Sequence, residues 1–184
     1  MVAVISMAFG QMVMVLVMVI TSLHMKGHQH MLSDISLVVS SHTFGMYAFS
    51  ILSGRLADRW GRGPVIIIGA STLVVACIAA TLSPDVLPLS VALFLLGLGW
   101  NFCFVGGSTL LADQLSPVER ARTQGFNDLL VGCASALGSL GSGFIFASLG
   151  YNTMAWIAAG FALLPLLAAS FWTRKLVRVS EASS

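Results

Sequence analysis

The sequence predicts an all-α integral membrane protein with six transmembrane helices, and three observations support this. Hydrophobic residues make up 57% of the 184 residues and charged residues only 9%, and the mean hydropathy is +0.93. Soluble domains carry roughly 25% charged residues, so this chain has too little polar surface to cover a globule in water. The apolar residues also gather in six segments, and the basic residues are divided unequally between the connections.

Each apolar segment is long enough to cross a bilayer, which takes about 20 mostly apolar residues in a helix. Short connections that hold nearly all the charge separate the segments. We expect a single six-helix domain over residues 1–184 that ends in a polar tail, 173–184. The predicted spans cover about 2–23, 35–54, 64–82, 87–112, 123–149 and 151–172.

Basic residues favour alternate connections. Eight of the nine Lys and Arg residues fall in the second connection, the fourth connection and the tail, and only Lys26 lies in the others. Because cytoplasmic loops of membrane proteins are enriched in Lys and Arg, we expect both termini and the tail in the cytoplasm. The net charge of +2 is too small to indicate a nucleic-acid partner, so the expected partner is the lipid bilayer.

The first two segments contain side chains that bind soft metal ions. Met14 and Met18 are four residues apart, as are His42 and Met46, so each pair shares one face of a helix. At 1.5 Å per residue, all four lie roughly 7–17 Å below the outer surface of a core about 30 Å thick. Neutral thioether and imidazole donors suit Cu(I) better than Mg²⁺, Ca²⁺ or Mn²⁺. The pattern therefore indicates a site for Cu(I) as a substrate, with no resident cofactor.

A simpler interpretation stays open, because methionines fill gaps in apolar cores and an intramembrane histidine can relay protons or hydrogen-bond across helices. Other candidates lie elsewhere in the chain. His24, His28 and His30 in the first outer connection could capture metal ions before entry. Asp128, near the inner end of the fifth segment, is a candidate for proton coupling because intramembrane acids are often functional. No catalytic pattern is apparent, so we do not expect an enzyme.

The connection between the second and third segments carries the most specific motif, GRLADRWGRG at residues 54–63. Glycine at positions 54 and 61 permits tight turns and close helix contact, and Asp58 and Arg62 can form charge-assisted hydrogen bonds at the membrane face. The string resembles the signature of the major facilitator superfamily, G-x-L-a-D-r-x-G-r and a further basic residue, with Gly63 at that last position. The matching residues are Gly54, Leu56, Ala57, Asp58, Arg59, Gly61 and Arg62.

The resemblance implies a conformational latch in an alternating-access carrier. In this superfamily an acid at the cytoplasmic end of the fourth helix joins the motif, and Asp113 occupies that place. The implied latch comprises Gly54, Asp58, Arg59, Gly61, Arg62 and Asp113. A simpler interpretation is that the arginines only set the topology.

Transporters of this superfamily have two six-helix halves with the substrate path between them. The resemblance therefore implies that the chain is one half. We expect it to be a fragment of a protein of about twice the length, whose N-terminal half is missing, or to pair with a second copy of itself.

The two metal-binding patterns, M-x-x-x-M and H-x-x-x-M, resemble the signature that the CcoA-like copper importers, a bacterial branch of the superfamily, carry in their seventh and eighth helices. Met14, Met18, His42 and Met46 occupy those positions. This resemblance implies the C-terminal six-helix half of a Cu(I) importer in the bacterial cytoplasmic membrane. Two alternatives remain: a proton-coupled exporter of drugs or small organic compounds, and a half-length membrane protein that binds a metal or a partner without transport.

Overall fold

The computed structural model describes residues 1–182, and the regular secondary structure over that range is entirely helical. This confirms the all-α fold that the composition predicts. The helices are α1 (Val2–Gly27), α2 (Leu32–Tyr47), α3 (Ser50–Trp60), α4 (Arg62–Ala79), α5 (Val86–Asp113) and α6 (Pro117–Ala182).

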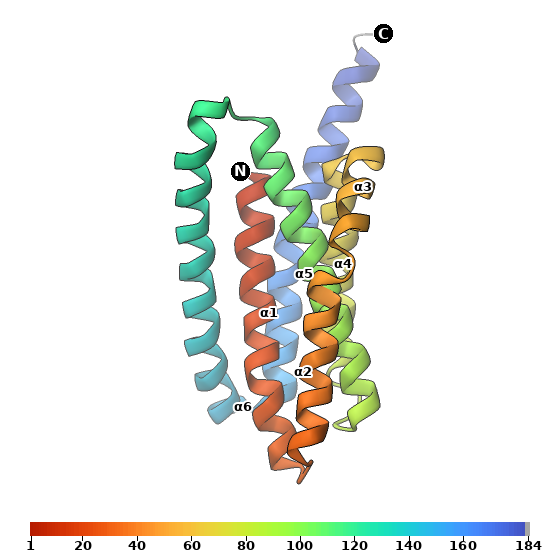
Figure 1. The fold of residues 1–184 in the computed structure, drawn as a ribbon, viewed down its shortest axis with the longest axis vertical. Helices are drawn as coiled ribbons and strands as arrows, with labels where there is room; N and C mark the ends of the chain where they lie inside the picture. The colour runs from red at the N-terminus through yellow and green to blue at the C-terminus, as the bar shows by residue number, and fades with distance from the viewer. Residues whose placement is uncertain (183–184) are drawn as a thin grey trace.

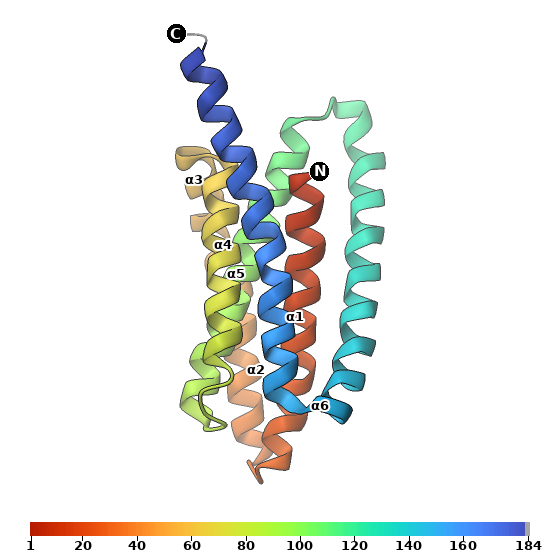
Figure 2. The same cartoon turned by 180° about the vertical axis from the view of Figure 1, so that it is seen from behind.

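Helix α6 consists of two arms that meet at Gly150. Gly150 has φ 79° and ψ 175°, a backbone conformation outside the helical region that glycine adopts without steric cost. The chain folds back on itself there, so the first arm (117–149) and the second arm (151–182) run side by side with α1 (Figures 1 and 2). Among residues 1–182, five helical stretches are long and apolar enough to cross a membrane, and the last contains both arms. If each arm crosses the membrane separately, the total is the predicted six spans. That number stays a prediction.

The motif at residues 54–63 lies mostly in a helix rather than in a loop, contrary to the expectation. The second apolar segment bends at Ala48 and Phe49 and continues as α3 to Trp60, and only Gly61 separates α3 from α4. The motif has no proline, so the helix continues beyond the apolar region until Gly61 ends it. Gly61, with φ 90°, makes the turn expected of it. At Gly54 no turn is found, because this residue lies inside α3 with open space around it.

The main core lies where α5 packs against its neighbours, α1, α2 and α4, and where the second arm of α6 covers α1 and α4. Small residues allow a close crossing between α2 and α5. A Cβ atom on Gly45 would overlap the backbone oxygen of Phe94, and one on Gly97 would overlap that of His42. This crossing sets the position of α2, which carries two of the four predicted metal ligands.

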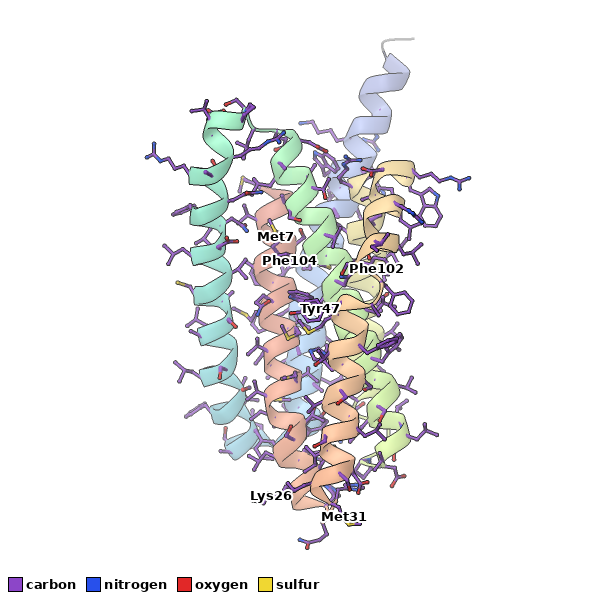
Figure 3. All side chains as sticks on the ribbon, in the orientation of Figure 1. Met7, Lys26, Met31, Tyr47, Phe102 and Phe104 are labelled. Carbon is purple, nitrogen blue, oxygen red and sulfur yellow. The ribbon has the colours of Figure 1, made fainter. Side chains whose placement is uncertain are left out.

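The two ends of the bundle differ in their content. The start of α1, the end of α6, α3 and the α5–α6 connection lie toward one end, whereas the labelled Lys26 and Met31 lie at the other (Figures 1 and 3). The segments that hold eight of the nine basic residues therefore share one end. On one broad side of the bundle, α1, α2, α5 and the first arm of α6 face the viewer in Figure 1, with α4 and the second arm behind (Figure 2).

Candidate functional site

His42 lies in the middle of the α2 face that packs against α5, together with Val38 and Gly45. Only 1% of its surface is exposed. Its Nδ1 atom lies 3.0 Å from the backbone oxygen of Leu93 on α5. Its other ring nitrogen, Nε2, is fully buried and has no hydrogen-bond partner.

These contacts determine what the imidazole can do. A carbonyl oxygen only accepts hydrogen bonds, so Nδ1 carries the proton that it donates to Leu93. In the neutral ring Nε2 then holds a free lone pair. Metal-binding histidines have this arrangement, with one nitrogen anchored to a carbonyl or carboxylate and the other directed at the metal.

The three predicted methionine ligands lie around the same helices. Met14 on α1 is buried, with 7% of its surface exposed. Met18, one turn further along α1, is partly buried against the main core, and Met46, one turn after His42 on α2, is also partly buried. Helices α1 and α2 contact each other directly. Convergence of the four side chains on a single ion stays a prediction.

The three outer histidines have different contacts in the structure. The rings of His24 and His28 lie 4.4 Å apart between their centroids, and His24 stacks on Tyr151 at 4.0 Å. His30 instead lies with its Nε2 atom 3.0 Å from the backbone oxygen of Pro84, in the α4–α5 connection. Over residues 1–182, no group of three or more His, Cys, Asp or Glu side chains is arranged to hold a metal ion. Capture of a metal ion by His24, His28 and His30 stays a prediction.

The predicted latch residues Asp58, Arg62 and Asp113 meet at the basic end of the bundle. Arg62 Nε donates to Asp113 at 2.7 Å, and Arg62 Nη2 lies 3.2 Å from Asp58. A third bond runs from Arg62 Nη1 to the backbone oxygen of Ala57 at 2.8 Å. A single guanidinium therefore links α3, α4 and α5, while Arg59 is exposed.

Asp128, the candidate for proton coupling, lies exposed on the first arm of α6. Its neighbour Asn127 is the buried polar residue, with 4% of its surface exposed. Asn127 donates to the sulfur of Met7 at 3.5 Å, and its Oδ1 atom is buried without a partner.

Three uncharged polar or aromatic residues that the sequence analysis did not single out connect these helices. Asn101 on α5 donates to the backbone oxygen of Met46 at 2.6 Å. Trp100, beside it, donates from Nε1 to Gln11 on α1 at 2.7 Å. Their position in the sequence could have identified them, because an amide or indole in the middle of an apolar segment needs a polar partner inside the bundle.

Comparison with known proteins assigns the chain to a family. The family profile described as Major Facilitator Superfamily matches residues 1–184. The chain belongs to the Major Facilitator Superfamily. With five long apolar helical stretches among its described residues, it is a multi-pass membrane protein of this transporter family.

Three relatives within the Major Facilitator Superfamily match most of this chain. The uncharacterized MFS-type transporters YdeG and YddS of Bacillus subtilis are 38% identical over 91% of this chain and 36% identical over 96% of it. The riboflavin transporter RfnT of Brucella anthropi is 31% identical over 84% of the chain. The matched regions cover 39%, 41% and 39% of these relatives, so the chain spans about two-fifths of their length.

Proposed function

We propose that this chain is part of an alternating-access carrier that takes up Cu(I) across the bacterial cytoplasmic membrane. The observation that carries the proposal is the buried Nε2 atom of His42, which has no protein partner while Nδ1 is anchored to Leu93. A buried polar atom without a partner is costly unless a ligand satisfies it. Cu(I) binding at Nε2 would supply that partner.

Thioethers would complete the coordination of the ion. By residue count along α1 and α2, two contacting helices, Met14, Met18 and Met46 would lie within about one helical turn of the level of His42. Thioether and imidazole are soft, neutral donors that select Cu(I). With no thiolate in the set, binding stays weak enough for release, which a carrier requires. No covalent step is involved, so the protein would not act as an enzyme.

Arg62 would control access from the other end. It joins α3, α4 and α5 in the conformation described here, and separation of these helix ends would expose the site to the cytoplasm. The complete substrate path would need a second six-helix unit, either the N-terminal half of the same protein or a second copy of this chain.

Copper accumulation in cells tests the proposal. We expect His42→Gln and Met14→Leu, made in the native protein, to lower copper uptake by about tenfold or more, since each removes a ligand while keeping a similar volume. Met7→Leu is the matched control, because Met7 is also a buried methionine of α1 but is not one of the predicted ligands. Uptake that His42→Gln and Met14→Leu leave unchanged, at normal protein levels, would contradict a copper site.

A second candidate is a proton-coupled exporter of drugs or small organic compounds. The similarity to a riboflavin transporter favours an organic substrate, and aromatic side chains on α2 and α5 would contact it. His42 or the exposed Asp128 would then carry the proton. If the same variants leave copper uptake intact but abolish resistance to, or movement of, an organic compound, this second function replaces the first.

A further inference from the structure

Three aromatic rings from two helices meet on the side of the bundle where α1, α2 and α5 lie together. The Trp100 and Phe104 rings stack with centroids 5.0 Å apart and planes 18° from parallel. Tyr47 meets Trp100 edge-on at 6.3 Å. We call Tyr47, Trp100 and Phe104 the aromatic cluster. In Figure 3 the labelled Tyr47 and Phe104 lie near mid-height on this side.

The depth of the aromatic cluster is unusual for a membrane protein. Tyr47 and Trp100 lie near the middle of the apolar stretches Leu32–Trp60 and Val86–Asp113. Tyr and Trp normally gather at the membrane surface, where their polar atoms reach water. Tyr47 nevertheless is 62% exposed at mid-span, and no hydrogen bond of the described residues uses its hydroxyl. A phenol facing lipid there would lack any partner, which is costly, whereas a path for water or substrate along this surface would supply one.

Trp100 is held rigidly in this position. Its Nε1 atom donates to Oε1 of Gln11 at 2.7 Å, and Gln11 Nε2 donates in turn to Ser135 on the first arm of α6 at 3.2 Å. The indole is thus tied to two other helices and cannot rotate freely. A rigid aromatic surface loses little conformational entropy when a ligand covers it.

The chemistry of the aromatic cluster selects its ligand. The rings offer stacking faces and edges, and the hydroxyl of Tyr47 can donate to a ring nitrogen or a carbonyl oxygen. None of the three side chains, nor Gln11 or Ser135, carries a charge. We propose that the aromatic cluster binds the flat, uncharged aromatic ring system of a small organic ligand, with Tyr47 supplying a hydrogen bond. This inference rests on the second proposed function, a carrier of organic compounds.

Direct binding tests the inference without a transport assay. The native protein in lipid nanodiscs is titrated with lumichrome, an uncharged fluorescent tricyclic compound, and bound ligand is measured by fluorescence polarisation. We expect Trp100→Leu to weaken binding by about tenfold, the upper range for loss of an aromatic pair, and Trp100→Phe to restore most of it. Tyr47→Phe should lower affinity several-fold, about the contribution of one hydrogen bond.

Controls separate binding from folding. Trp156→Leu is the matched variant, because Trp156 is 57% exposed on the second arm of α6, away from the aromatic cluster; it should bind as the native protein does. If Trp100→Leu fails to fold, Tyr47→Leu at an exposed position takes its place. Absence of lumichrome binding, or equal binding by Trp100→Leu, Tyr47→Leu and Trp156→Leu, would overturn the inference, even if vesicles transport another organic compound. Intact binding without any transport would instead contradict only the carrier assignment.

Discussion

At the scale of single residues, two glycines decide where His42 lies. Gly45 and Gly97 let the backbones of α2 and α5 approach so closely that a Cβ atom at either position would overlap a carbonyl oxygen of the other helix. The same approach brings His42 Nδ1 within hydrogen-bond distance of Leu93. The imidazole is therefore oriented by the packing of small residues one turn away from it.

Gly97→Ala should separate α2 from α5. Since the methyl group has no room against the backbone of His42, we expect a loss of about 1–3 kcal/mol in stability and a lower Tm in detergent. Unfolding can be followed with a thiol-reactive dye, because Cys77 and Cys103 are buried in the native state.

Gly132→Ala provides the control for this packing prediction. Gly132 lies inside a helix with no atom within 4 Å of the added methyl group, and alanine favours a helix over glycine by about 1 kcal/mol. Its Tm should stay unchanged or rise. A Gly97→Ala protein as stable as Gly132→Ala would contradict the proposed role of this crossing.

At the scale of elements, the break between α2 and α3 links the candidate site to the latch. Helix α2 carries His42 and Met46, and α3 carries Asp58. The last backbone carbonyls of a helix have no hydrogen-bond partner within that helix. Met46 lies in the last turn of α2, and its carbonyl accepts a hydrogen bond from Asn101 on α5. Asn101 also donates to Ser50 at 2.9 Å and accepts from Ser53. One buried amide thus bridges both sides of the break.

Asn101→Leu should loosen this break while keeping a similar side-chain volume. Removal of the amide deprives the buried Ser53 hydroxyl and the backbone carbonyl of Met46 of their partner Asn101. We therefore expect the free energy of unfolding to fall by about 1–3 kcal/mol. Hydrogen exchange should become faster in residues 46–53. Asn152→Leu, at an exposed position on α6, is the control, and exchange rates at 46–53 that do not differ between the two variants would refute the bridging role.

At the scale of the whole molecule, charge is concentrated at one end of an apolar bundle. Eight of nine Lys and Arg residues lie in segments at the end that also contains the start of α1 and the end of α6. The preference of basic residues for the cytoplasm predicts how the bundle sits in the membrane. The candidate metal site would then be entered from the side of Lys26 and the His24–His28 pair.

Cysteine labelling checks this orientation. In a Cys133→Ser background, which removes the exposed native thiol, Ser33→Cys should react with a membrane-impermeant maleimide in intact spheroplasts, and Gln114→Cys should not. Both positions are exposed in the structure and lie at opposite ends of the bundle. In inverted vesicles, Gln114→Cys should react and Ser33→Cys should not. Labelling of Gln114→Cys in spheroplasts would show that the orientation predicted from the charges is wrong.

The sequence separations predicted the contacts among Asp58, Arg62 and Asp113 better than the contact of His30, for a physical reason. Asp58, Arg62 and Asp113 lie at the ends of helices joined by short connections, and opposite charges at such ends attract each other, so the sequence separations were informative. His30 is close to His28 in sequence but is held by Pro84, a residue of a distant connection. The sequence distance between His28 and His30 could not reveal this contact with Pro84.

Which segments become helices, and which end carries the positive charge, follows from the amino-acid sequence alone, because both depend on the local transfer of side chains between water and hydrocarbon. The helical course of the motif, the anchored ring of His42 and the aromatic cluster with its tie to Gln11 appear only in the folded structure. They depend on how each helix is rotated against its neighbours, and that rotation results from packing between residues far apart in the chain.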